Sequence, residues 1–160
     1  MKALALARAV HVVAVVLWIG GVAMVTTVLL PAIRSLPLSE DPFTFFERIE
    51  RRFAFHARIL TLVAGASGFY MLHEMGGWSR YLSLASWWLH AMTLVWAIFT
   101  VLLFVLEPLV LHRKLAELAR RDPEGTLAWI QRAHWGLLTF SVIAIAGAVA
   151  GSHGWTLGLG

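Results

Sequence analysis

The chain has 160 residues, of which 59% are hydrophobic and 14% charged, and a mean hydropathy of +0.76. This composition is too apolar for a soluble domain and indicates a polytopic membrane protein. The absence of cysteine excludes disulfides, thiolate metal sites and covalent attachment of a c-type haem. The net charge of +4 comes from basic residues in short loops beside apolar stretches, where we expect lipid headgroups and no nucleic acid.

Four apolar stretches predict membrane-spanning helices, over residues 3–30, 53–75, 82–111 and 134–152. Residues 82–106 contain a single ionisable side chain, His90, and at about 1.5 Å per residue they exceed the roughly 30 Å of a hydrocarbon core. The first stretch follows Lys2 and lacks a small-residue cleavage site, so we expect it to be a retained helix and not a signal peptide. Pro31 is expected to end it, because proline has no N–H to continue the helix.

The connections between these stretches are short, and no separate soluble domain is visible in them. The segment SLPLSEDPFTFFERIERRF predicts an interfacial helix capped by Asp41 or Ser39, and Gly76-Gly77-Trp78 predicts a tight loop. Residues 112–132 predict a helical extension and then a turn at residues 122–125. The sequence therefore predicts a single all-α domain over residues 1–160, an integral membrane four-helix bundle with up-down-up-down connectivity.

The basic residues predict the orientation of this bundle. Nine Lys and Arg residues lie in the two longer loops, against three near the opposite side, which are Lys2, Arg8 and Arg80. Cytoplasmic loops carry the excess of positive charge. We therefore expect both termini outside a bacterial-type inner (cytoplasmic) membrane.

Each predicted span carries one histidine near its N-terminal end: His11, His56, His90 and His134. His11 and His90 are expected at one depth near the outer side, and His56 and His134 at a second depth near the inner side. In a cyclic bundle each pair is diagonal, so that two imidazoles face each other across the bundle. A single histidine in a membrane could simply bond to a neighbouring helix. Two depth-matched pairs instead favour bis-His ligation of two haems, of the b type because no CxxCH motif is present.

Further residues are candidates for holding or serving these haems. Arg8 and Arg52 share the helix face of His11 and His56 and could bind haem propionates bidentately. Trp18 lies farther along the face of His11, so its indole is expected to pack near the inner haem or to separate the two. Glu107, which precedes Pro108, is the one acid within an apolar span and is either a proton-relay group or a headgroup-level acid.

Three histidines lie at predicted helix ends, His73 and His153 on the outer side and His112 on the inner side. They are either wet interfacial residues or, for His73 and His153 together with Glu74, an outer substrate or copper site. An imidazole titrates near neutral pH, so His73 or His153 could exchange a proton with a redox partner.

Short motifs along the chain show two resemblances. HVVAVVLWIGG followed by LLPAIR, with His11, Trp18 and Gly21, resembles the copper-resistance protein D family. FERIERRF and WWLH are similar to the four-helix membrane protoporphyrinogen oxidases, a resemblance that implies a b-type haem. Met92 stands where the oxidase pattern has a lysine.

The interpretation that unites these features is a membrane diheme b-type cytochrome carrying electrons between the two membrane faces. Its partners would be the bilayer and a quinone or a small diffusible species such as superoxide, and homodimer formation is compatible with it. The alternatives are a copper-handling membrane protein and a haem-dependent protoporphyrinogen oxidase-like enzyme. Copper transfer favours methionine or histidine ladders, which Met24, Met71, Met75 and Met92 do not form.

Overall fold

The computed structural model describes residues 2–35 and 41–155, and all the regular elements of this part are helical. Four of its helices are long and apolar enough to cross a membrane: Lys2–Ser35, Pro42–Glu74, Leu84–Leu111 and Pro123–Ser152. The all-α fold class is thereby confirmed, and each predicted apolar stretch overlaps one helix that is long and apolar enough to cross a membrane. The apolar exteriors of these helices are compatible with contact to a lipid bilayer.

The elements follow one another with few interruptions. The first span combines α1 (Lys2–Met24), the π-helical η1 (Val25–Leu29) and α2 (Leu30–Ser35), and the second is α3 (Pro42–Glu74). Two short 3₁₀ segments, η2 (Gly77–Leu82) and η3 (Leu84–Ser86), lead into α4 (Trp87–Val101) and the π-helical η4 (Leu102–Leu111). The chain ends with α5 (His112–Arg121) and α6 (Pro123–Ser152).

The helix boundaries differ from the predicted ones in three places. Pro31 does not end the first helix, because the continuous helix Lys2–Ser35 runs through it, and the π-helical turn η1 just before it accommodates a residue without an N–H. The predicted interfacial helix and the second span form one continuous α3, and the Asp41 carboxylate accepts from the Thr44 N–H at 2.9 Å as its N-cap. The fourth span begins at Pro123, where Asp122 caps α6 by accepting from the Gly125 N–H at 2.9 Å. Ser39, the other predicted cap, lies outside the described residues.

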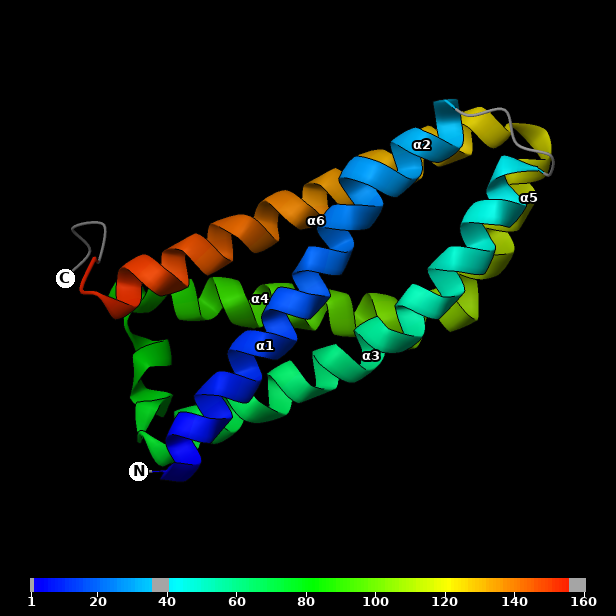
Figure 1. The fold of residues 1–160 in the computed structure, drawn as a ribbon. Coiled ribbons are helices and arrows are strands. Elements are labelled where there is room, and N and C mark those ends of the chain that lie inside the picture. Colours follow the sequence, from blue (N-terminus) through cyan, green and yellow to red (C-terminus); the bar gives the residue numbers. More distant parts are fainter. Residues whose placement is uncertain (1, 36–40, 156–160) are drawn as a thin grey trace.

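The long helices run between two ends of the molecule (Figure 1). The start of α1, the end of α6 and η2 lie at one end, which we call the termini end. The short helices α2 and α5 lie at the other, which we call the loop end. Most of the contacts between long helices join α1 to α3 and α4 to α6, and fewer join one pair to the other. The space between the two pairs is therefore the natural place for a cavity.

Close packing within and between the pairs depends on glycine. A Cβ added to Gly147 would collide with the Trp87 indole, and one added to Gly151 would collide with Trp88. This GxxxG spacing lets α4 approach α6 closely, as small residues commonly do in membrane helices. Gly65 of α3 accommodates Trp96 in the same way.

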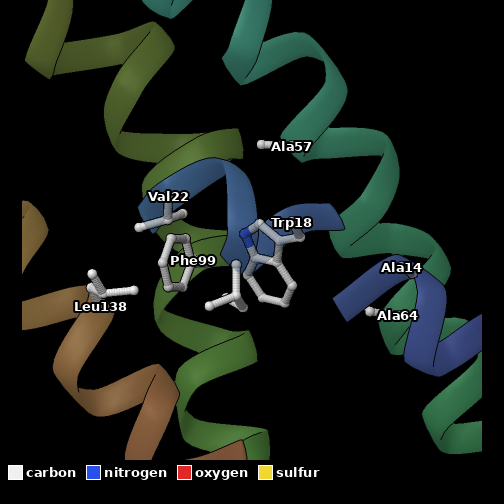
Figure 2. Packing of buried hydrophobic residues seen from close by; sticks show 8 residues of the cluster. Ala14, Trp18, Val22, Ala57, Ala64, Phe99 and Leu138 are labelled. Atoms are coloured by element: carbon white, nitrogen blue, oxygen red, sulfur yellow. The ribbon is translucent and has the colours of Figure 1, made fainter. Parts of the chain in front are cut away.

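The middle of the molecule is filled by a core around Trp18 (Figure 2). The indole packs edge-on against Phe99, with ring centroids 4.8 Å apart, and Ala14, Val22 and Leu138 complete this contact. A second core at the loop end is built from larger side chains, among them Leu30, Phe43, Phe46, Leu127 and Ile130. Trp18 thus stands where the two ends of the bundle meet.

Candidate functional site: two cavities on either side of Trp18

A cavity of about 910 Å³ opens at the termini end between α1, α3, η2, α4 and α6. We call it the termini-side cavity, and its lining includes Arg8, His11, Trp18, Arg80, Trp96, Ser141 and His153. Ligand pockets in proteins typically measure roughly 300–1,000 Å³. The termini-side cavity therefore has room for a large organic cofactor.

His11 is held in this cavity by a neighbouring helix. Its Nδ1 donates to the carbonyl oxygen of Ala64 at 2.9 Å and lies 3.2 Å from the Ser67 hydroxyl. A carbonyl oxygen can only accept, so Nδ1 carries the proton and Nε2 keeps its lone pair. This is the tautomer of a metal-ligating histidine with a second-shell carbonyl. A Cβ on Gly68 would lie 3.2 Å from the imidazole, so the absence of a side chain at this position of α3 leaves room for the His11 ring.

The opposite helix pair contributes a second histidine to the lining. His153, the C-cap of α6, donates from Nδ1 to the Val149 carbonyl at 2.7 Å, so that in the neutral imidazole Nε2 carries the lone pair. Arg8 and Arg80 line the same cavity. The cavity thus combines two imidazoles, two guanidinium groups and a largely apolar wall.

His90, the predicted partner of His11, is turned away toward η2. Its Nδ1 and Nε2 each lie 3.1 Å from a carbonyl oxygen, those of Ser86 and Tyr81 respectively. The imidazole also packs edge-on against the Tyr81 ring at 5.4 Å, and the Tyr81 hydroxyl bonds to Thr93 at 2.6 Å. Within the described residues, His90 is not part of the cavity lining. The structure therefore does not bring His11 and His90 together in one cavity.

The predicted inner histidines are likewise separated. His134 lines a second, smaller cavity, whereas His56 is exposed on α3 with its Nδ1 bonded to the Arg52 carbonyl at 2.8 Å. Arg52 itself is exposed. The second cavity measures about 180 Å³, well below the size of a typical pocket for an organic cofactor. The residues at this end do not fit a haem.

The second cavity, which we call the loop-side cavity, has a different chemical lining. Its polar members are Glu47, Glu50, Glu107 and His134, and most of the others are apolar, among them Trp18, Phe43, Phe53 and Phe99. Trp18 lines both cavities, so its indole is the wall between them. That the indole separates two haems stays a prediction.

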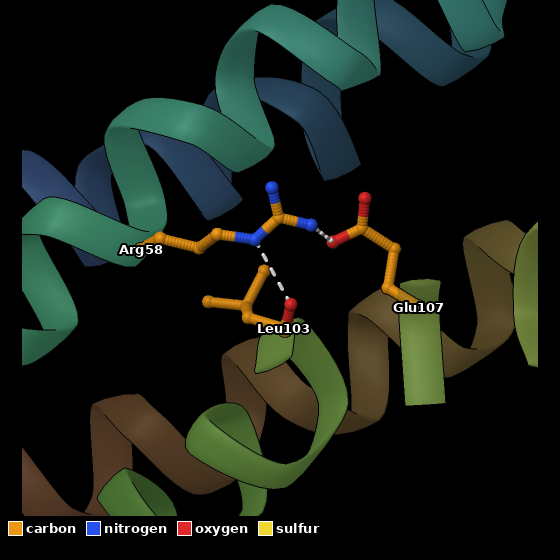
Figure 3. A network of polar contacts seen from close by, with 3 residues as sticks. All are labelled: Arg58, Leu103 and Glu107. Atoms are coloured by element: carbon orange, nitrogen blue, oxygen red, sulfur yellow. Dashed lines mark hydrogen bonds and ion pairs between the residues drawn. The ribbon is translucent and has the colours of Figure 1, made fainter. Parts of the chain in front are cut away.

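Glu107, which lines the loop-side cavity, forms an ion pair with Arg58 (Figure 3). Arg58 donates from Nη2 to the Glu107 carboxylate at 2.7 Å and from Nε to the Leu103 carbonyl at 2.9 Å. In the π-helical register of η4 that carbonyl would accept from residue 108, which is a proline without an N–H. The guanidinium therefore satisfies an orphaned acceptor as well as an acid. This role of Arg58 was missed, although a proline inside an apolar span signals such a carbonyl.

The predicted outer metal site is not assembled. His73 and Glu74 are exposed at the end of α3, and no three His, Cys, Asp or Glu side chains of residues 2–35 and 41–155 form a group able to hold a metal ion. The side chain of His112 lies outside the described residues. Arg80, Tyr81 and Trp96, which line the termini-side cavity, were not predicted to do so because their positions depend on the path of η2 and on helix rotation. No family model, curated protein or solved structure matches the chain.

Proposed function

We propose that the chain is a membrane b-type haem protein that exchanges electrons with a small redox partner. The observation that carries the proposal is the unprotonated Nε2 of His11 at the wall of a 910 Å³ cavity. When bound there, haem b would supply one-electron chemistry. The residues of the chain would bind it, orient it and control the access of water and protons.

The termini-side cavity fits such a group in three respects. His11 would offer its Nε2 as an iron ligand, with the tautomer fixed by the Ala64 carbonyl. Arg8 and Arg80 offer bidentate donors for two propionates. The facing surface of α6 is lined by small residues, Ser141, Ala144 and Ala148, which leave space for a flat macrocycle.

His153 is the better candidate for a second axial ligand than His90. It lines the cavity from the opposite helix pair and in its neutral form carries the lone pair on Nε2, whereas both nitrogens of His90 face carbonyl oxygens. Because the loop-side cavity is too small for a macrocycle, the proposal contains a single haem where the sequence predicted two.

The proposal includes the membrane arrangement predicted from the sequence. The short connections and the loop arginines support an up-down-up-down bundle with both termini outside a bacterial-type cytoplasmic membrane. A quinone headgroup or a diffusible species such as superoxide would then react at the termini end. The exposed His73 would be available there to exchange a proton with it.

The test is a haem determination on the purified protein. Pyridine haemochrome analysis, with oxidised and dithionite-reduced spectra, is expected to give about one haem b per chain. His11→Ala should lose most of it, and the matched control His56→Ala should keep it because His56 is exposed and outside the cavity. A wild-type protein without haem, or His11→Ala with full haem, would overturn the proposal. A value near two would restore the inner histidine pair.

A further inference from the structure

The loop-side cavity gathers ionisable groups that the haem proposal does not use. Glu47 and Glu50 come from α3, Glu107 from η4 and His134 from α6. His134 donates from Nδ1 to the Ile130 carbonyl at 2.9 Å, so its Nε2 is a proton acceptor. Three carboxylates and an imidazole therefore surround a space of about 180 Å³ in an otherwise apolar region.

A second and independent feature of this cavity is an unpartnered donor. The Trp18 side chain is buried, with 3% of its surface exposed, and its indole Nε1 has no hydrogen-bond partner among the described residues. In Figure 2 the nitrogen lies on the edge of the ring nearer to Ala57 than to Ala64, that is, on the side toward the loop end. A buried indole N–H normally finds an acceptor, so an acceptor within the loop-side cavity is expected.

The size and chemistry of the space favour water as the occupant. At about 30 Å³ per molecule, the cavity can hold several waters, each of which needs two to four polar partners. Water can accept from the Trp18 N–H and donate to the carboxylates and to His134 Nε2. The space is too small for a typical organic ligand, and the described residues form no metal-binding group.

We propose that the loop-side cavity is a hydrated proton-holding site, in which water, Glu50 and His134 retain a proton taken up from the loop end. The charged groups around Glu50 are Glu47, Arg51 and Arg58 on α3 and Glu107 on η4, with His134 facing it from α6. The lining contributed by α1 and α5 carries no charge. Carboxylates that repel one another in a space of low dielectric are relieved by a shared proton.

The coupling part of this inference rests on the proposed function. If haem is bound in the termini-side cavity, its one-electron reduction by the redox partner would add a negative charge there, and uptake of one proton from the loop-end solution into the loop-side cavity would compensate that charge across Trp18. The indole N–H is only a donor and cannot relay the proton itself. It orients a water molecule at the boundary, and the two sites interact electrostatically. Oxidation releases the same proton to the loop end.

The hydrated site is tested first, by a measurement that does not need haem. Infrared pH titration in H₂O and D₂O of the wild-type protein in lipid vesicles should show the C=O band of a protonated carboxylic acid that shifts on deuteration. The band should be lost or moved in Glu50→Gln and perturbed in His134→Gln. It should be unchanged in Glu117→Gln, an exposed acid on α5. The absence of the band, or an unchanged band in both cavity variants, overturns the inference.

The coupling is tested by the dependence of the haem midpoint potential on pH. One proton per electron corresponds to about 59 mV for each tenfold change in proton concentration. The wild type should approach this slope over part of the pH range, and Glu50→Gln should lose at least half of it. Equal slopes would refute the coupling while the infrared result still decides the hydrated site. A protein without haem would refute the proposed function and leave the infrared test intact.

Discussion

The two cavities occupy opposite sides of one tryptophan in the same helical frame, yet they differ fivefold in volume and carry opposite kinds of charged group. The termini-side cavity, at about 910 Å³, is lined by imidazoles and guanidinium groups. The loop-side cavity, at about 180 Å³, is lined by carboxylates and a single histidine. The comparison indicates that a cofactor needs space and a ligand, whereas a proton needs only water and an acid.

Both cavities are lined by large and small residues, and the placement of these residues contributes to the difference in volume. At the termini end the helices present small residues to the space between them, such as Ala64, Gly68 and Ala144. At the loop end Phe43, Phe46 and Phe53 fill the corresponding space. The same backbone arrangement therefore leaves a large opening in one half and a small one in the other.

The largest expected effect tests which histidine would be the second haem ligand in the termini-side cavity. If His11 and His153 together hold a haem as proposed, His153→Ala is expected to convert the spectrum from low-spin to high-spin, because one of the two imidazole ligands is lost. His90→Ala should leave the spin state unchanged, since His90 bonds to η2 and lies outside the cavity lining. Visible and electron paramagnetic resonance spectra would decide between them. A high-spin His90→Ala protein with a low-spin His153→Ala protein would show that the original pairing is correct.

A smaller effect is expected at the boundary of the loop-side cavity. Arg58→Met removes the partner of both Glu107 and the Leu103 carbonyl, and leaving such groups unpaired costs about 1–3 kcal/mol. The side chains of the pair are 32% and 23% exposed, so the larger losses found for fully buried pairs are not expected. Thermal unfolding in detergent would measure the change. Arg113→Met, at an exposed position on α5, is the control, and equal stability of the two variants would show that the pair contributes nothing.

The sequence predicts the helices better than it predicts the site. Hydropathy and length define a span wherever apolar residues continue for about 20 positions, and all four were found. The direction of a histidine side chain depends on the rotation of its helix and on the carbonyl groups nearby. The periodicity of the sequence reveals neither of these. His90 shows this, because it was expected at the depth of His11, whereas the carbonyls of Ser86 and Tyr81 face both of its nitrogens.

Reasoning along a single helix places residues on a common face without knowledge of the neighbouring helices. Arg8 precedes His11 by about one turn, and both line the termini-side cavity. Ser141, about two turns after His134 on α6, lines that cavity as well. Predictions that required two helices to meet, such as the pairing of His56 with His134, did not match the structure.

The smallest expected effect separates a dry loop-side cavity from a hydrated one. Trp18→Phe and Trp96→Phe both replace an indole by the smaller phenyl ring. Trp96→Phe also removes a known hydrogen bond, which the Trp96 Nε1 donates to the Thr61 carbonyl at 3.0 Å. If water accepts from Trp18 Nε1, the two variants should lose similar stability, including about 0.5–1.5 kcal/mol for the hydrogen bond. If the cavity is dry, Trp18→Phe removes an unsatisfied buried N–H and should be milder than Trp96→Phe by about 1–3 kcal/mol. Unfolding of both variants in the same detergent would measure the difference, whose size indicates whether an acceptor is present beside Trp18.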